Sequence, residues 1–415
     1  PAADAGATAP RPETAADAPR YNDRLAVDLS PVQIDSLLAV WRERQTLGAY
    51  EEFFSTYVGF DPAAAAAGDR TPDSVYVRRL RDLVSPVQLP YNYIVKGYID
   101  RYTNVRSGTI SRILGMSQYY FPLIEEELIK AGLPVELRAL PIIESALSPT
   151  AVSPMGAAGL WQFMPATGKV YGLEVNSLVD ERCDPVLSTR AACRYLKDLY
   201  TLYKDWTLAI AAYNCGPGNV NKALARAGDG SRTFWDIYDF LPRETRGYVP
   251  AFIGASYAYA YHKLHGIEFT EPPLPLATDT IRVDRLLHLG QVSSTIDIPM
   301  ETLRQLNPQY KLDIVPATTK TYSLVLPQRY VCRYIQQQDS IFAKDSAYLK
   351  EYMNPANLEK KRQQRSGTIY TVKKGDTLGA IARKYRVTTA QLMRWNGIKN
   401  ANKLRLGQKI RIEGR

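Results

Sequence analysis

The spacing of apolar positions is helical along most of the chain between residues 89 and 266. Large apolar residues recur there every three or four positions and polar residues fill the gaps, as in helices that bury one face. Strand-like alternation is almost absent from this region. The pattern predicts an α-helical domain with helices at 115–131, 134–147, 188–204, 206–213, 220–227 and 248–265, of which the third and fourth are expected to be capped by Ser188 and Asp205.

The C-terminal third shows a different pattern, and it occurs twice. Between residues 280 and 326, two short strand-like runs enclose two helical patterns. The same order returns more sharply between 369 and 412, where a turn at Gly375-Asp376-Thr377 precedes the first helix and Asp376 is expected to be its N-cap. We therefore expect a mainly α fold that ends in two small β-α-α-β modules, the first of them degenerate.

Composition suggests where these parts begin and end. The Ala/Pro-rich opening is too poor in large apolar residues to fold, and we interpret it as the mature start of an exported protein. A proline-rich linker follows the helical domain. The expected domains are a flexible tail (1–24), an N-terminal helical extension (25–88), the helical domain (89–266), the degenerate module (278–330), a helical or flexible connector (331–365) and the terminal module (366–415).

The net charge is concentrated in the terminal module. Residues 366–415 hold twelve of the 52 Lys and Arg residues but only two of the 42 Asp and Glu residues, so these fifty residues account for the whole net charge of +10. A basic module on a neutral body predicts a polyanionic partner, which could be nucleic acid, an anionic membrane surface or a cell-wall polymer. The chain has no apolar run of the length that a membrane span needs.

Glu144 is the most unusual position in the helical domain. With Leu137, Leu140 and Leu147 it falls on one stripe of the expected helix, although Pro141 disturbs the spacing. A buried charge is costly unless it is paired, or unless the site raises the pKa of the carboxyl and uses it as a proton donor. Periodicity does not distinguish a structural ion pair from a catalytic acid.

Other reactive residues give weaker signals. The cysteines Cys183, Cys193, Cys215 and Cys332 lack metal-binding spacing, and an oxidising compartment could pair some of them. A nucleophile at Cys215 is disfavoured because no histidine lies in the motifs. The acidic cluster Asp180, Glu181 and Asp184 has Arg182 within it and Pro185 after it, so we interpret it as a solvated turn at a helix start. We expect no metal and no cofactor.

The motifs also resemble a known family. Glu144-Ser145, the run 159–162 (Gly-Leu-Trp-Gln), the run 212–216 (Ala-Tyr-Asn-Cys-Gly) and the run 244–248 (Glu-Thr-Arg-Gly-Tyr) occur in this order. Together they resemble the catalytic domain of soluble lytic transglycosylase family 1, and the terminal module resembles a LysM domain. The family usually has Gly-Leu-Met-Gln, so Trp161 is expected to change one wall of the sugar site.

The resemblance implies a lysozyme-like α fold and cleavage of the β-1,4 bond between N-acetylmuramic acid and N-acetylglucosamine in peptidoglycan. The muramyl 6-hydroxyl would close onto C1 in place of water, with Glu144 acting first as acid and then as base. The resemblance assigns substrate binding to Ser153, Gln162, Met164, Tyr213, Asn214 and Tyr248, and glycan binding by the LysM domain to Gly375, Asp376, Thr377, Leu378 and Asn396.

The residues leave other interpretations open. A true muramidase would hydrolyse the same bond with a second carboxylate, and a non-catalytic scaffold would only bind peptidoglycan. Gln162 and Asn214 could merely cap loops, and Tyr213 and Tyr248 could be core aromatics with satisfied hydroxyls. The expected partners are peptidoglycan strands and not nucleic acid. The expected location is the periplasm or cell envelope, as a monomer, with any membrane attachment through a lipid anchor upstream of residue 1.

Overall fold

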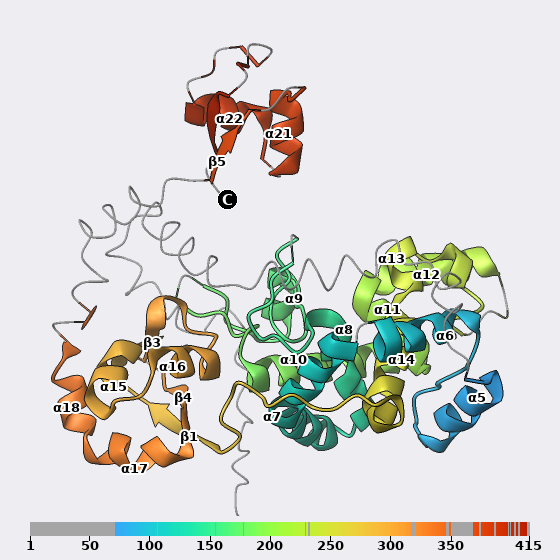
Figure 1. The fold of residues 1–415 in the computed structure, drawn as a ribbon, viewed down its shortest axis with the longest axis horizontal. Helices are drawn as coiled ribbons and strands as arrows, with labels where there is room; N and C mark the ends of the chain where they lie inside the picture. The colour runs from blue at the N-terminus through green and yellow to red at the C-terminus, as the bar shows by residue number, and fades with distance from the viewer. Residues whose placement is uncertain are drawn as a thin grey trace, which may run out of the picture. The chain divides into compact units, whose positions relative to one another are not determined.

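The computed structural model describes residues 71–349 and 368–412, apart from 106, 154, 177, 229, 231–232, 318–319, 346–347, 373–374, 386, 397, 399, 402–403 and 406. These residues are mainly helical, and their strands form three two-stranded sheets (Figure 1). The expected mainly α fold with two small β-α-α-β modules is thereby confirmed. The expected tail and most of the N-terminal extension lie outside the described residues. Residues 71–349 and 368–412 belong to different compact units, which are described separately.

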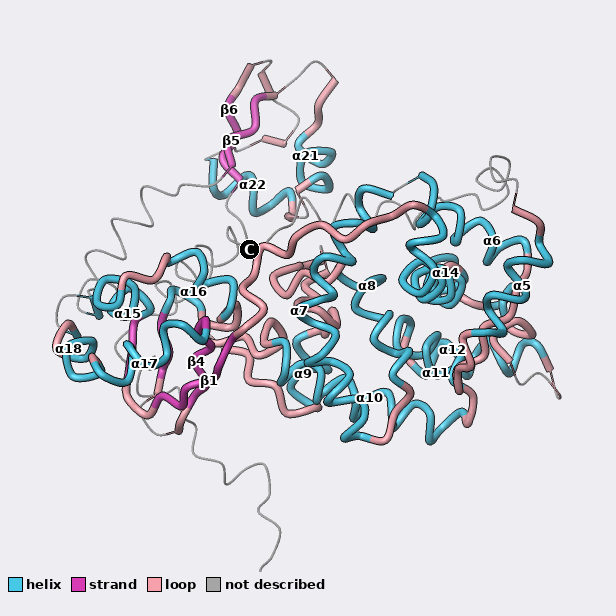
Figure 2. Tube along the Cα trace, turned by 60° about the horizontal axis from the view of Figure 1, so that its bottom comes forward, coloured by secondary structure: helices cyan, strands magenta, loops and turns pink. Residues whose placement is uncertain are grey.

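The helical domain is built around one helix that is apolar on all sides. Ten of the 14 residues of α14 (Tyr248–Tyr261) are buried, as expected for a helix without a polar face. It packs against α6, α8 and α11 (Figure 2). The other elements are α5 (Asp73–Asp82), α6 (Tyr93–Asp100), the π-helical turn η1 (Arg101–Val105), α7 (Ser107–Ala131), η2 (Val135–Ala139), α8 (Leu140–Ser145), α9 (Pro165–Val170), α10 (Pro185–Tyr203), α11 (Trp206–Cys215), α12 (Pro217–Ala227), η3 (Tyr238–Phe240), α13 (Arg243–Arg246) and η4 (His262–His265).

Side-chain caps start several of these helices. Asp205 accepts a hydrogen bond from the Leu208 amide at 2.8 Å and begins α11, as predicted. The prediction for Ser188 is wrong, because Asp184, four residues earlier, accepts bonds from two amides and is the N-cap of α10. Ser188 instead lies in the first turn of α10 and donates to the Asp184 carbonyl.

The first small module contains the predicted β-α-α-β order with additions. Strands β1 (Thr278–Val283) and β4 (Tyr322–Pro327) pair antiparallel, with Ile281 opposite Leu324. Between them lie α15 (Leu289–Ile296) and α16 (Met300–Leu306), and two further strands form a second small sheet that the sequence pattern did not indicate. The remaining elements are β2 (Leu286–His288), η5 (Lys311–Asp313), β3 (Ile314–Pro316), α17 (Gln328–Gln336) and α18 (Gln338–Phe342).

The terminal module has the predicted order in a simpler form. Its elements are β5 (Thr368–Thr371), α21 (Leu378–Lys384), α22 (Thr389–Asn396) and β6 (Lys409–Ile412), and β5 pairs antiparallel with β6. Its core contains Leu378, Leu392 and Ile410. The expected cap Asp376 is wrong by one residue: the Thr377 hydroxyl accepts from the Ala380 amide at 3.1 Å, whereas Asp376 accepts from the Tyr370 hydroxyl at 2.7 Å.

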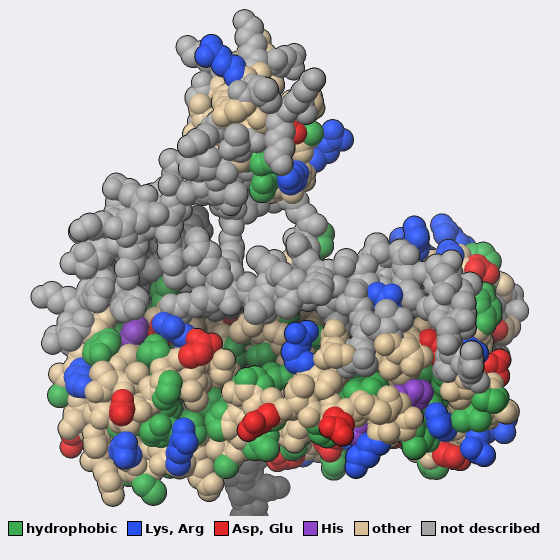
Figure 3. Space-filling view, in the orientation of Figure 1, with side chains coloured by type: hydrophobic (Ala, Val, Ile, Leu, Met, Phe, Trp, Pro, Cys, Tyr) green, Lys and Arg blue, Asp and Glu red, His purple; other side chains and the backbone are tan. Residues whose placement is uncertain are grey.

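The surface of the terminal module retains the basic character seen in the sequence. Arg383 and Lys384 of α21 and Arg405 are exposed, and Lys and Arg side chains are visible on the face shown in Figure 3. Within the described part of the chain, no helix combines the length and apolar character needed to span a membrane. Of the expected connector, residues 331–342 belong largely to α17 and α18, and residues 350–365 lie outside the described part.

Candidate active site

Glu144 lies near the C-terminal end of a short, fully buried helix. All six residues of α8 are buried, and the Glu144 residue is 6% exposed. The expected single helix over 134–147 is instead a 3₁₀ turn, η2, followed by α8. The helix ends because Ala146 and Leu147 have φ values of 51° and 58°, a left-handed conformation that is unfavourable for residues with a Cβ. The chain therefore turns sharply just after the carboxylate.

The surroundings of Glu144 favour its protonated form. The pKa of the Glu144 carboxyl is raised to about 8, mainly by burial and to a smaller extent by the nearby charge of Glu244. A hydrogen bond from the Tyr248 hydroxyl to Oε1 of Glu144 acts in the opposite direction. None of these influences is a cation, so they do not support the interpretation of Glu144 as a structural ion pair. They are the conditions that keep a carboxylic acid protonated near neutral pH.

The raised pKa of Glu144 predicts a specific loss of stability as the pH rises. In the unfolded chain the carboxyl loses its proton near pH 4.5, whereas the folded protein keeps it up to about pH 8. The contribution of Glu144 to stability is thus fully present below pH 4.5 and is lost between pH 4.5 and 8, at up to about 1.4 kcal/mol per pH unit. Urea unfolding of the wild type and of Glu144→Gln across this range would measure the difference. Parallel stability curves would contradict the shift.

Residues 156–163, which we call the Gln162 loop, are hydrogen-bonded to the end of α8. The Ser145 hydroxyl donates to the Leu160 carbonyl at 3.0 Å, which joins the residue after Glu144 to this loop. Gln162 has a φ of 48°, and its Nε2 donates to the carbonyls of Ala151 and Gly159 at 3.1 and 2.9 Å. Its Oε1 is buried and has no hydrogen-bond partner within the described part of the chain. Because a buried acceptor without a partner is costly, this oxygen is available to a ligand donor.

Trp161 does not form a wall of the site. Its side chain has no exposed surface, and the indole Nε1 donates to the Thr189 hydroxyl at 2.8 Å in the core. The expectation that a tryptophan here changes the sugar site is therefore wrong. The side chain at this position points into the domain, where its N–H finds a partner on α10.

The third and fourth motifs meet the first two around Glu144. The Tyr213 hydroxyl donates to the Trp161 carbonyl at 2.9 Å, and the charge of Glu144 helps to raise the pKa of Tyr213, after the larger effect of burial. Asn214 accepts from the Thr245 hydroxyl at 2.9 Å, which links α11 to α13 just before Tyr248. The structure thus brings together Glu144, the Gln162 loop, Tyr213, Asn214 and Tyr248.

Ser153 and Met164 flank the Gln162 loop. The Ser153 residue is 9% exposed, and its hydroxyl accepts a hydrogen bond from the Ala157 amide at 3.0 Å, which closes the turn that Ser153 begins. Met164 precedes α9 and is 42% exposed. These contacts place both residues at the loop ends and do not join either of them to Glu144.

The acidic cluster before α10 differs from its expected state. Asp180, Glu181, Arg182 and Asp184 are all buried, so the prediction of a solvated turn is wrong, although Asp184 does begin a helix. Arg182 forms a bidentate pair with Asp180, from Nε at 2.8 Å and Nη2 at 2.7 Å. Opposite charges two residues apart were the only sequence signal for this pair. The four cysteines carry free thiols.

The predicted glycan-binding residues of the terminal module lie at two places. Gly375, Asp376 and Thr377 form the turn before α21, and Asn396 ends α22, where its Nδ2 donates to the Leu392 carbonyl at 2.8 Å. Leu378 is buried in the module core, which limits it to a structural role.

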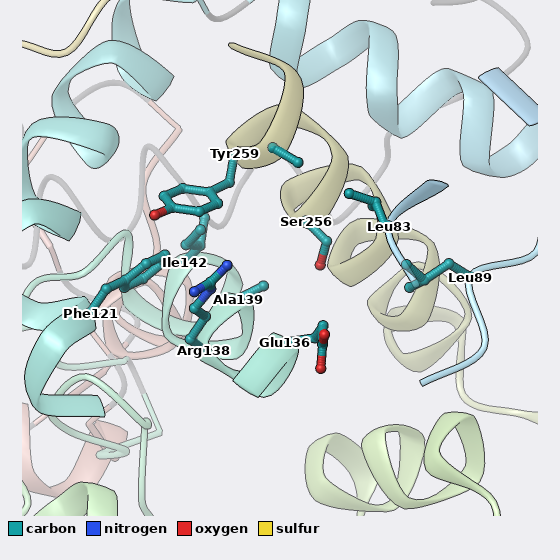
Figure 4. A pocket seen from close by; sticks show the side chains of 10 residues that line it. Leu83, Leu89, Phe121, Glu136, Arg138, Ala139, Ile142, Ser256 and Tyr259 are labelled. Carbon is teal, nitrogen blue, oxygen red and sulfur yellow. The ribbon is translucent and has the colours of Figure 1, made fainter. Parts of the chain in front are cut away.

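A small cavity lies outside this group of residues. Its volume is about 80 Å³, and Ile142, Phe121, Arg138 and Tyr259 are among the residues that line it (Figure 4). Arg138 stacks its guanidinium on the rings of Phe121 and Tyr259, at 5.4 and 4.9 Å from their centroids. None of the predicted site residues lines the cavity, so the cavity is not the candidate active site.

Known families match three parts of the chain. The Transglycosylase SLT domain matches residues 121–235, the LysM-like domain of lytic transglycosylase MltD matches 277–343, and the LysM domain matches 370–413. Among similar structures are an inactive mutant of lytic transglycosylase Slt from Pseudomonas aeruginosa (20% identity, TM-score 0.32, 61% of this chain and 38% of that one) and the 70 kDa soluble lytic transglycosylase from Escherichia coli (18%, 0.31, 61% and 47%).

Sequence relatives agree with these matches. Membrane-bound lytic murein transglycosylase D from Escherichia coli (strain K12) is 32% identical over 296 residues, which are 71% of this chain and 63% of that protein. Soluble lytic murein transglycosylase from the same organism is 31% identical over 123 residues, 28% of this chain and 19% of that one. This chain thus spans less than two thirds of these relatives. The chain is similar to membrane-bound lytic murein transglycosylase D and carries, in order, a transglycosylase SLT domain, an MltD-type LysM-like domain and a LysM domain.

Proposed function

We propose that this protein is a lytic transglycosylase, which cleaves the β-1,4 bond between N-acetylmuramic acid and N-acetylglucosamine in peptidoglycan without adding water. The observation that carries the proposal is the Glu144 carboxyl, which is buried, has a pKa raised to about 8 and accepts a hydrogen bond from Tyr248 beside the Gln162 loop. The similarity to lytic murein transglycosylases supports it.

The chemistry needs one carboxyl group from the protein. Protonated Glu144 donates its proton to the glycosidic oxygen as the bond to C1 breaks. The resulting carboxylate then takes the proton of the muramyl 6-hydroxyl, whose oxygen closes onto C1 and leaves a 1,6-anhydro end. Hydrolysing glycosidases ordinarily use two carboxyls, because one must activate water or attack C1. Here the substrate supplies the nucleophile.

Tyr248 and Gln162 have distinct positioning roles in this proposal. The Tyr248 hydroxyl fixes Oε1 of Glu144, which leaves the second carboxyl oxygen to carry the proton. Oε1 of Gln162 has no hydrogen-bond partner among the residues that the structure describes and can accept from an N-acetyl N–H or a sugar hydroxyl. Ser153, Met164, Tyr213 and Asn214 complete the proposed substrate-binding set.

Product analysis of digested sacculi tests the reaction type. Mass spectrometry should find muropeptides lighter by one water than their hydrolytic counterparts, whereas reducing ends alone would identify a muramidase. A hydrolase would need a second carboxyl, and Glu244 is the carboxyl whose charge acts on Glu144. Glu244→Gln should therefore leave the anhydro product unchanged, whereas reducing ends that the wild type forms and this variant no longer forms would identify Glu244 as the second carboxyl of a hydrolase.

The terminal LysM domain is proposed to hold the enzyme on glycan chains through the turn at 375–377 and Asn396. Removal of residues 366–415 should weaken binding to sacculi by about two orders of magnitude, because a second binding site raises the effective concentration of substrate. Turnover of short soluble glycans should stay unchanged. If sacculus binding and turnover of short soluble glycans fell equally, a separate anchoring role for this domain would be contradicted.

A charge variant serves as the control for this truncation. Arg383→Gln with Lys384→Gln removes two exposed positive charges from α21 without touching the turn. If this double variant alone lowers binding as much as the truncation, attraction by charge and not glycan recognition accounts for anchoring.

The proposed substrate places the protein in the cell envelope, with peptidoglycan strands as its partner. Attachment to the outer membrane through a lipid upstream of residue 1 is part of the proposal. Fractionation of envelopes from cells that produce the complete protein tests this attachment, and recovery in the soluble periplasmic fraction would exclude it.

A further inference from the structure

One chain segment lies between the Gln162 loop and the MltD-type LysM-like module. We define the support segment as residues 174–184, apart from 177. The support segment precedes α10, and within their common compact unit it contacts both neighbours through bonds that involve main-chain groups. Its buried charges are used by neither the proposed reaction nor a ligand site described above.

On one side, Arg182 holds both ends of the Gln162 loop. Its Nη1 donates to the Gly156 carbonyl at 2.8 Å and to the Phe163 carbonyl at 2.9 Å. Its other two nitrogens bind the buried Asp180 carboxylate, so the planar guanidinium is fixed in one orientation. A single side chain therefore closes the loop in which Gln162 takes its left-handed conformation.

On the other side, the LysM-like module pairs with the support segment like an added strand. Val179 and Tyr310 form an antiparallel bridge. The Asp180 amide donates to the Gln309 carbonyl at 2.9 Å, and the Lys311 amide donates to the Leu178 carbonyl at 2.8 Å. Asp180 thus contacts two partners. Its main chain binds the module, and its carboxylate binds the Arg182 guanidinium.

Charged and aromatic side chains reinforce the same contact. Lys320 pairs with Glu174 and lies 3.7 Å from Glu181. The Tyr322 hydroxyl donates to Glu174 at 3.0 Å. Lys320 lies two residues before β4, and Tyr322 is its first residue.

We propose that the LysM-like module is a positioning element of the catalytic domain. It fixes the support segment, and Arg182, a positioning residue, then holds the Gln162 loop beside Glu144. The proposal rests on the proposed function and adds a task for the module other than glycan binding.

The position of the docking residues within the LysM-like module agrees with a positioning role. The residues that dock through their main chain lie between α16 and β4, and the corresponding place in the terminal module lies between α22 and β6. Asn307 follows α16 in the first module, at the place where Asn396 ends α22 in the terminal module. The Asn307 side-chain amide donates to the Leu303 and Val325 carbonyls at 2.9 and 2.8 Å, and it accepts from the Val325 amide at 2.8 Å. This end of the first module is therefore occupied by protein.

The test loosens the contact in the full chain by combining Lys320→Ala with Tyr322→Phe. Hydrogen exchange of the amides in 156–163 should speed up, because Ala158 and Phe163 bond to each other within that loop. On a short soluble glycan, kcat should fall about tenfold while KM stays within about twofold. Arg285→Ala is the matched control, since Arg285 pairs with Asp345 inside the module, and it should change neither quantity.

The outcomes separate the possibilities. Unchanged exchange in 156–163 would overturn the proposal, whatever the activity. A rise in KM with unchanged kcat would also overturn it, because it would mean that the module contacts substrate. If the wild type makes no anhydro product, the proposed function fails, yet the exchange result still decides whether the module supports the loop. Arg182→Lys should produce the same pattern more strongly.

Discussion

Replacing Glu144 by glutamine is expected to lower the turnover of peptidoglycan by about three orders of magnitude, within the range that a general acid contributes. Glutamine has nearly the same size but cannot donate a proton to the glycosidic oxygen or later accept one. The Tyr248 hydroxyl can still donate to the remaining carbonyl oxygen, so the site should keep its geometry. Release of soluble muropeptides from sacculi, followed over time, measures the loss.

Glu136→Gln is the matched control for this experiment. Glu136 lies eight residues earlier and lines the small cavity, and none of the described residues forms a hydrogen bond with its buried Oε2. The same substitution there should leave turnover within about twofold, because the group lies outside the candidate site. The Glu144→Gln variant should unfold at a urea concentration no lower than the wild type, since removal of a poorly solvated carboxyl relieves a cost. A variant that stays folded and still releases muropeptides would exclude Glu144 as the acid.

Replacing Gly159 by alanine is expected to destabilise the helical domain by about 4 kcal/mol or more, the range of severe core substitutions. Gly159 has a φ of 85°, and an added Cβ would lie 1.7 Å from the Arg182 carbonyl oxygen and 2.6 Å from its carbon. Those atoms are main chain in the support segment and cannot move aside as a flexible side chain would. Urea unfolding followed by tryptophan fluorescence measures the effect.

Gly156→Ala separates backbone conformation from steric overlap. Gly156 has nearly the same φ, 86°, but an added Cβ there would meet nothing within 4 Å. The expected cost is therefore only that of the left-handed conformation, about 1 to 2 kcal/mol. Equal destabilisation by the two variants would show that the contact between the Gln162 loop and the support segment does not restrict residue size.

The sequence predicted the parts of the fold whose signals are local. The apolar spacing around Leu140 and Leu147 identified the burial of Glu144, and the repeated strand and helix order identified both small modules. Helix caps were harder to predict, because two neighbouring residues can have capping side chains. Asp376 and Thr377 can both cap a helix, but the Asp376 carboxylate accepts a hydrogen bond from the Tyr370 hydroxyl, and Thr377 is the cap. Three-residue strands such as β2 and β3 are too short to show a period.

The candidate site was predicted as a set of motifs but not as an arrangement. Four motifs meet around Glu144 as the resemblance implied. The burial of Arg182 was not predictable, because its side chain binds the Gln162 loop and the residues before it pair with a segment near Tyr310, about 130 positions further along the chain. A charged pair in a turn has the same local pattern whether water or protein covers it.

The buried indole of Trp161 has a consequence for the variation of related sequences. Its Nε1 needs an acceptor, and the Thr189 hydroxyl provides one while it donates its own hydrogen to the Pro185 carbonyl at 2.6 Å. A methionine at position 161 has no N–H and places no such demand on position 189. Among relatives, tryptophan at the first position should therefore accompany a hydroxyl residue at the second, and the two positions should covary although 28 residues separate them.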